Sequence, residues 1–309
     1  MISKMRGRKK IIALFAAFLL GATTLSACGG GSDETDKVIR IGMPSPGDAG
    51  QAVWDAAIAK FKEANPDWDV ELIIQDDDIY STVGLQGLLT GGNPPDAYFE
   101  WAGARTAQRE KDGYAADLSD LISSSTLKDL FPETAFNSGK VNGKALLLPT
   151  GSDVTNVMWY DVDTFAKLGI AVPTTWDELL AACAKIKAAK QDCLSVGNKD
   201  LWVAGNLFGH LYSRVIGEET YHKIMTRELP MNSPELVKAY GVVEDLQKKG
   251  FVNASANSIA DNEGYTLFFK GGAAMLPIGS WLVGIAAEQA PNKKIDWFNM
   301  PAFSDGAGD

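Results

Sequence analysis

The sequence predicts an α/β protein made of two units, and three observations carry this prediction. Between residues 38 and 101, strand-like and helical segments alternate in the order typical of a parallel sheet covered by helices on both faces. The alternation restarts after Pro149, with no repeat at a solenoid period. About 280 residues remain once an N-terminal leader is set aside, and a chain of that length usually forms two domains.

The N-terminal segment is typical of an exported precursor. Five cations lie within residues 1–10, and the apolar run 11–20 follows, too short to cross a bilayer as a helix of about 20 residues. We expect residues 1–27 to be removed as a signal peptide. Cys28 directly follows a Leu-Ser-Ala tripeptide, which resembles the lipobox of bacterial lipoproteins and implies lipidation of Cys28, palmitate included. The polar, glycine-rich residues 28–36 predict a flexible tether.

In the first unit, short strand-like runs alternate with amphipathic segments. Apolar side chains recur at helical spacing after Gln51, and Asn65 ends that helix because the following proline disfavours helical geometry there. Asn142 and Gly143 predict a tight turn. We expect strands at 38–42, 70–74 and 96–101, and helices at 51–65 and 79–90.

The second unit has clearer helix ends. Thr175 and Glu178 have the spacing of a capping box, and Ser233, Pro234 and Gly250 mark the start and end of a further helix. The units are expected to join near residues 148–152. We expect strands at 157–160, 273–276 and 295–298, and helices after Pro173, at 202–215, 233–249 and 261–270, and from Trp281.

Charge and residue counts limit the classes of partner. The net charge of −10 becomes −15 when residues 1–27, with five cations and no anions, are removed, which argues against electrostatic binding of nucleic acid or anionic lipid. His210 and His222 are the only histidines, so neither a histidine-based catalytic triad nor a three-histidine metal site can form. The acidic run 76–78 lacks the spacing of a calcium loop and is interpreted as a solvated turn. We expect no metal and no cofactor.

Cys183 and Cys193 lie ten residues apart in a chain expected to be exported, where a disulfide persists. A bridge would fix the end of the helix that contains Cys183. Two separate buried thiols are the alternative, and the spacing does not decide between them.

Five short segments occur in a fixed order along the chain: GNPPD leading to Trp101, GKALLLP at 143–149, WYD followed by Phe165, PTTWDEL at 173–179, and FKGGAAM at 269–275 with Gly-Ser-Trp at 279–281. Together they resemble the extracellular solute-binding proteins of ABC importers, in the carbohydrate-binding, maltose-binding-protein-like group. The resemblance implies a two-lobed type II periplasmic-binding-protein fold with a hinge between the lobes and ligand in the cleft.

The resemblance also implies how the chain is divided. Crossings between the lobes are expected near residues 148–151 and 276–280, so that 37–148 plus 277–309 form lobe one and 149–276 form lobe two. Members of the family usually continue beyond the equivalent of Phe303. We therefore expect the C-terminal part of the fold to be missing and lobe two to be incomplete.

Sugars present flat C–H faces rimmed by hydroxyl groups, so their sites combine aromatic rings with carboxylates and amides. The resemblance places three tryptophans where the family often has such groups. For each of the three, a partly buried position in the core is the alternative to a position in the ligand site. Trp54 and Trp176 are assigned to the core. The candidate ligand-binding residues are Trp101, Trp202 and Trp281 with the neighbouring polar residues Glu100, Arg105, Asp153, Asn206 and Ser280.

The function expected from these features is capture of a sugar or oligosaccharide and its delivery to an ABC permease, without catalysis. The protein is expected as a monomer, lipid-anchored at the extracellular face of the bacterial membrane or facing the periplasm, with no nucleic-acid partner. One alternative is an exported glycoside hydrolase, which needs two carboxylates such as Glu100, Asp153 and Asp161 provide. Another is a binder of a non-sugar solute such as a polyamine or metal chelate.

Overall fold

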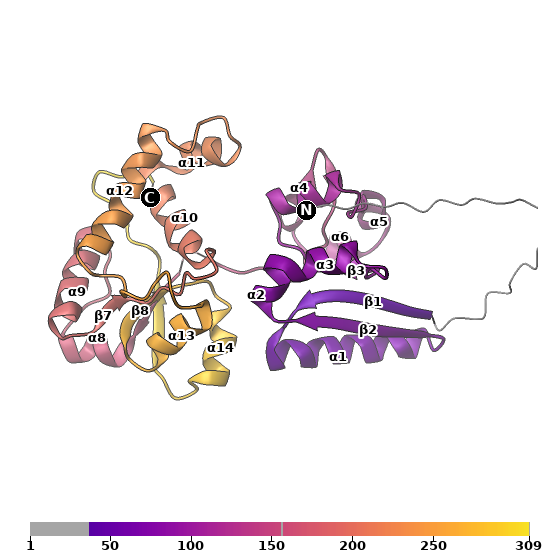
Figure 1. Ribbon diagram of the computed structural model, residues 1–309, viewed down its shortest axis with the longest axis horizontal. Coiled ribbons are helices and arrows are strands. Elements are labelled where there is room, and N and C mark those ends of the chain that lie inside the picture. Colours follow the sequence, from indigo (N-terminus) through magenta and orange to yellow (C-terminus); the bar gives the residue numbers. More distant parts are fainter. Residues whose placement is uncertain (1–36, 156, 309) are drawn as a thin grey trace, which may run out of the picture.

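The computed structural model describes residues 37–155 and 157–308. Within this part, two bodies lie side by side and are joined by one connecting segment: residues 37–148 form lobe one, and residues 157–308 form lobe two (Figure 1). Cys28, the expected signal peptide and the expected tether lie outside the described residues. None of the described helices is long and apolar enough to span a bilayer.

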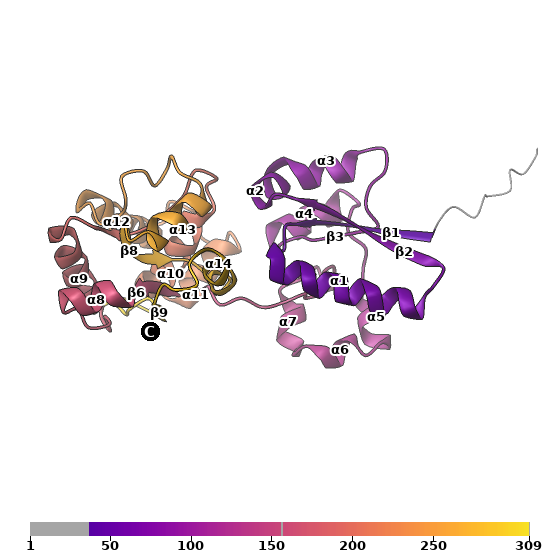
Figure 2. The ribbon, with the colours of Figure 1, turned by 90° about the horizontal axis from the view of Figure 1, so that it is seen from below.

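Lobe one is built on a parallel sheet with strand order β2-β1-β3. β1 (Lys37–Pro44) pairs with β2 (Trp68–Gln75) along its whole length, and α1 (Gly47–Ala64) lies along one face (Figure 2). β3 (Ala97–Tyr98) is shorter than expected. The backbone N–H of Phe99 still donates to the carbonyl of Gly42, but the chain leaves the sheet at Glu100. The buried carboxylate of Glu100 accepts a hydrogen bond from Arg109, a residue of the next helix.

The helix expected at residues 79–90 is formed in three pieces. α2 (Asp77–Ile79) is followed by a π turn (Tyr80–Gly84) and α3 (Leu85–Thr90). The Asp76 side chain caps α2 by accepting hydrogen bonds from the backbone N–H groups of Asp78 and Ile79. Tyr80, fully buried, places its hydroxyl 3.0 Å from the Gly42 carbonyl oxygen and so fixes the π turn on β1.

The rest of lobe one is a run of short elements beside the sheet. The predicted tight turn is confirmed: Asn142 and Gly143 have φ of 51° and 80°, as a two-residue hairpin turn requires. The elements are α4 (Ala104–Lys111), α5 (Ser119–Ser124), α6 (Leu127–Leu130), α7 (Glu133–Asn137), β4 (Lys140–Val141) and β5 (Lys144–Ala145).

Lobe two has a mixed four-stranded sheet of order β7-β8-β6-β9. β7 (Asp192–Leu194) is parallel to β8 (Ala273–Pro277), whereas β6 (Met158–Asp161) is antiparallel to both β8 and β9 (Ile295–Phe298). Every residue of β6 and β8 is buried, since helices cover both faces of the sheet.

Five helices of lobe two begin close to the predicted positions, whereas α8 (Val162–Leu168) and α11 (Glu218–Met225) were not predicted. Thr175 and Glu178 form the expected capping box, and Ser233 caps the helix that begins at Pro234. The helices are α8 (Val162–Leu168), α9 (Trp176–Ala188), α10 (Val203–Ile216), α11 (Glu218–Met225), α12 (Pro234–Lys248), α13 (Asp261–Phe269) and α14 (Leu282–Gln289).

The expected division into lobes is wrong for residues 277–309. Those of them that the structure describes belong to lobe two, because β9 satisfies its backbone hydrogen bonds on β6, and the carbonyl of Ala302 accepts a hydrogen bond from the N–H of Trp176. The crossing expected near residues 276–280 is likewise absent from the described chain. Pro277 ends β8 inside lobe two, and Ser280 bonds back to the connecting segment.

Cys183 of α9 and Cys193 of β7 form a disulfide, which decides between the alternatives that the spacing left open. Both residues are fully buried in the core of lobe two. The bridge therefore joins a helix to the strand that follows it.

Replacing both bridged cysteines by alanine is expected to lower the free energy of unfolding of lobe two by about 2 to 4 kcal/mol, because the unfolded chain regains the freedom of the closed loop. Urea unfolding followed by circular dichroism measures the change. Cys28→Ala serves as the control and should unfold like the wild type. A double variant as stable as the wild type would contradict a stabilising bridge.

Candidate functional site

In both views α2 lies on the side of lobe one that is turned toward lobe two (Figures 1 and 2), and α1 of lobe one lies close to α14 of lobe two. Burial raises the pKa of Asp77 and of Asp78; the charge of Asp261 of lobe two adds to both shifts, and that of Asp200 adds to the shift of Asp78. We take the region between the two lobes as the candidate site and refer to it as the cleft that the family resemblance implies, with α2 on one side and the N-terminal residues of α10 and α13 on the other.

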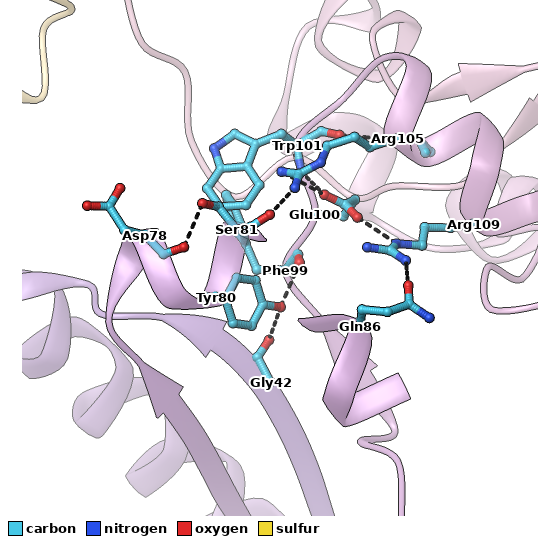
Figure 3. A network of polar contacts seen from close by, with 11 residues as sticks. Gly42, Asp78, Tyr80, Ser81, Gln86, Phe99, Glu100, Trp101, Arg105 and Arg109 are labelled. Atoms are coloured by element: carbon cyan, nitrogen blue, oxygen red, sulfur yellow. Dashed lines mark hydrogen bonds and ion pairs between the residues drawn. The ribbon is translucent and has the colours of Figure 1, made fainter. Parts of the chain in front are cut away.

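Glu100 is part of a buried polar framework below the cleft surface of lobe one (Figure 3). Its side chain is 1% exposed, and Arg109 Nε donates to Glu100 Oε2 at 2.8 Å. Arg109 Nη1 donates to Gln86 Oε1 at 2.6 Å, and the backbone N–H of Trp101 donates to Glu100 Oε1 at 3.1 Å. Both carboxylate oxygens are thus engaged, so Glu100 shapes the loop that carries Trp101.

Trp101 is half-buried and packs edge-on against Phe99, with ring centroids 4.9 Å apart. The guanidinium carbon of Arg105 lies 5.3 Å from the centre of the Trp101 ring, a cation–π arrangement. Arg105 also donates to the carbonyl of Ser81 (Figure 3). A ligand that stacks on Trp101 therefore meets the guanidinium of Arg105 as well.

Trp202 and Trp281 are brought together from positions 79 apart in the sequence. Their ring centroids are 6.2 Å apart, with the planes inclined by 48°, and both residues are half-buried. Burial raises the pKa of the Tyr265 hydroxyl, and the charge of Asp261 adds to the shift. Gly279 makes room for the pair, because a Cβ there would lie 2.0 Å from the Trp281 ring.

A hydrogen bond joins Asp153, in the connecting segment, to Ser280 of lobe two. Ser280 Oγ donates to Asp153 Oδ1 at 2.7 Å and accepts from the backbone N–H of Val154 at 3.0 Å. The backbone N–H of Ser280 donates to the carbonyl of Val154 at 2.8 Å. These three hydrogen bonds attach the connecting segment to lobe two.

Asn206 lies apart from the other candidates. It lines a cavity of about 790 Å³ beside α10, together with the half-buried His210 and the linker residue Thr155. Burial lowers the pKa of His210 and so favours its neutral ring. The cavity continues along α10 and α11 to Arg214, Glu218, Tyr221 and Gly308.

The predicted site residues therefore fall into separate groups: Glu100, Trp101 and Arg105 in lobe one, Trp202 with Trp281 in lobe two, Asp153 with Ser280 at the linker, and Asn206 in the cavity. Sequence reasoning missed the acidic residues of the cleft. Burial and the charges of Asp261 and Asp200 raise the pKa of Asp78 to about 6. The available signal was its position after a parallel strand, at whose carboxyl end ligands bind.

No group of three or more histidine, cysteine, aspartate or glutamate side chains suited to a metal ion exists among residues 37–155 and 157–308.

The chain matches the family model of bacterial extracellular solute-binding proteins over residues 44–308, and it belongs to that family. It is 26% identical over 306 residues to an uncharacterised ABC transporter extracellular-binding protein of Pyrococcus horikoshii, with 93% of this chain and 68% of that protein covered. It is 24% identical over 268 residues to the multiple sugar-binding protein of Streptococcus mutans, covering 81% of this chain and 59% of the relative.

Among solved structures, a chitin oligosaccharide binding protein is similar, with a TM-score of 0.73 and 27% identity over 84% of this chain and 65% of that one. The expected two-lobed α/β fold of solute-binding proteins is confirmed. The chain spans about two thirds or less of the length of these proteins.

Arg109→Met is expected to destabilise lobe one by about 3 to 5 kcal/mol, because it leaves the carboxylate of Glu100 buried without its partner. Arg105→Met is the matched control on the same helix. Its guanidinium is 46% exposed and 3.9 Å from Glu100, so its loss should cost less than about 1 kcal/mol. Urea unfolding of both variants measures the difference, and equal losses would contradict the framework role of the Glu100–Arg109 pair.

Proposed function

We propose that this protein captures a sugar or oligosaccharide in the cleft between its lobes and delivers it to a membrane permease of an ABC importer. The observation that carries the proposal is the pair of half-buried indoles, Trp202 and Trp281, on the side of the cleft formed by lobe two. Inclined aromatic rings 6.2 Å apart offer apolar faces to the C–H face of a pyranose.

Polar groups near the indoles match the hydroxyl rim of a sugar. The Asp78 and Asp261 carboxylates accept hydrogen bonds from hydroxyl groups, while Arg105 donates them beside Trp101. The printed names of the Streptococcus mutans relative and of the chitin oligosaccharide binding protein support a carbohydrate as the ligand class. Neither name selects a particular sugar for this chain.

The hydrolase alternative gains no support from the carboxylates that suggested it. Glu100 is buried against Arg109, Asp153 is bonded to Ser280, and Asp161 is paired with Lys293. A glycosidase needs two carboxyl groups flanking one glycosidic bond, and these three belong to separate local networks.

A cationic solute such as a polyamine is the second candidate. It is favoured by the carboxylates of Asp77, Asp78, Asp200 and Asp261, which act on one another across the cleft. An ammonium group would meet both these charges and the indole faces.

Anchoring completes the proposed function. Lipidation of Cys28 would hold the lobes at the extracellular face of the membrane through the tether at residues 28–36, near the permease. Whether the mature protein acts as a monomer is tested by its mass in solution. Cys28 and the expected tether lie outside the described part of the chain.

Trp281→Ala is expected to weaken oligosaccharide binding by about 1 to 3 kcal/mol through loss of ring contact, with the fold intact. Titration calorimetry with a panel of neutral oligosaccharides and spermidine measures affinity and separates the two ligand classes. Trp297→Ala is the matched control, because Trp297 is a 53% exposed tryptophan of the same lobe, and it should bind like the wild type.

Equal affinities of Trp281→Ala and the wild type would remove Trp281 from the site. Tight binding of spermidine without binding of any sugar would replace the sugar proposal by the cationic one. Release of reducing ends from the bound oligosaccharide would contradict a protein that binds without catalysis.

A further inference from the structure

The π turn at Tyr80–Gly84 leaves one backbone carbonyl for a side chain of another helix. The backbone N–H of Leu85 donates to the carbonyl of Tyr80, five residues earlier. In an α-helix that N–H would donate to the carbonyl of Ser81, four residues earlier. The Ser81 carbonyl instead accepts a hydrogen bond from the guanidinium of Arg105, a residue of α4 (Figure 3). The extra residue of the turn therefore provides an acceptor for Arg105.

Arg105 contacts three groups from different parts of lobe one. Besides the Ser81 carbonyl, the Trp101 ring faces its guanidinium, with 5.3 Å between the guanidinium carbon and the ring centre. Arg105 Nη1 lies 3.9 Å from Glu100 Oε1, an ion pair beyond hydrogen-bonding distance. A guanidinium has several N–H groups, and this side chain is 46% exposed. Arg105 therefore keeps donors for a ligand after it has bonded Ser81.

Buried contacts fix the position of the π turn. Tyr80 is fully buried, and its hydroxyl oxygen lies 3.0 Å from the carbonyl oxygen of Gly42 in β1 and 2.7 Å from that of Phe99. The ring of Tyr80 also packs edge-on against Trp101, with ring centroids 6.2 Å apart. The same turn thus supports both members of the Trp101–Arg105 pair.

We propose that the π turn is the positioning element of the ligand site in lobe one: its Ser81 carbonyl holds the guanidinium of Arg105 against Trp101, so that the ring and the remaining donors meet a sugar together. Tyr80 is the positioning residue, because its hydroxyl fixes the turn to the sheet. This inference rests on the proposed function, in which Arg105 donates to the ligand beside Trp101. A donor that is already held in place loses less conformational entropy on binding than a free side chain does.

Nuclear magnetic resonance tests the positioning without ligand. The Nε–H signal of Arg105, identified by its loss in Arg105→Met, should be shifted from the position of a free arginine by the ring current of Trp101. Deletion of the exposed residue Thr82 removes the extra residue of the π turn, and the signal should then return to the free position. A wild-type signal at the free position, or an unchanged signal after the deletion, would overturn the proposal.

Thr82→Ala is the matched control for the deletion, because it removes the exposed side chain and keeps the residue count of the turn. The Arg105 signal and the affinity for ligand should both be those of the wild type. Equal effects of Thr82→Ala and of the deletion would contradict a role of the π turn itself.

Titration calorimetry with the neutral oligosaccharides that bind the wild type measures the consequence for binding. Deletion of Thr82 should weaken binding about tenfold, the effect of losing roughly one hydrogen bond from a charged group. In the Arg105→Met background the deletion should have no further effect, and equal weakening in both backgrounds would contradict the positioning role. If no oligosaccharide binds the wild type, the proposed function fails, and the resonance measurement alone decides the position of Arg105.

Tyr80→Phe decides if the deletion variant does not fold by circular dichroism. It keeps the ring and removes the hydroxyl, so the Arg105 signal should move toward the free position and binding should weaken. Tyr98→Phe is its matched control in the same lobe: the Tyr98 hydroxyl lies 2.9 Å from the carbonyl oxygen of Tyr114, and its loss should change neither measurement. A Tyr80→Phe protein with the wild-type signal and affinity would refute the role given to Tyr80.

Discussion

The hydrogen bonds between Ser280 and the connecting segment are the constraint on which the two-lobed arrangement depends. Each lobe has its own sheet, and in the described chain one segment joins them. Ser280 bonds both backbone groups of Val154 and the carboxylate of Asp153, so the segment leaves lobe two in a fixed direction. Rotation between the lobes must then be absorbed on the lobe-one side of Asp153, where the exposed residues 150–152 lie outside any helix or strand.

The same serine also ties the linker to the aromatic site. Its neighbour Trp281 is one member of the indole pair. The indole N–H of Trp159, a residue of β6, donates to the carbonyls of Ile278 and Gly279, two buried residues that precede Ser280. The sheet of lobe two thus fixes the chain segment that bonds the linker and carries Trp281.

Much of the fold was predictable because local signals agree with the tertiary structure, as in the capping box of Thr175 and Glu178 and the turn at Asn142 and Gly143. The assignment of residues 277–309 failed since strand pairing is non-local, and nothing near β9 specifies β6 as its partner. Among the site residues, the family resemblance named Trp202 and Trp281 as candidates but assigned them to different lobes, and their proximity was not predicted because it depends on the chain after Pro277 staying in lobe two. The bonding of Asp153 to Ser280 depends on a partner more than a hundred residues away, which no spacing rule reveals.

Gly279 has a consequence for altering ligand selectivity. A methyl group there would occupy the space of the Trp281 six-membered ring, so even alanine would force the indole to another rotamer. Mutant libraries aimed at new specificities should therefore keep position 279 constant and vary position 202, whose ring faces that of Trp281 from the start of another helix, α10.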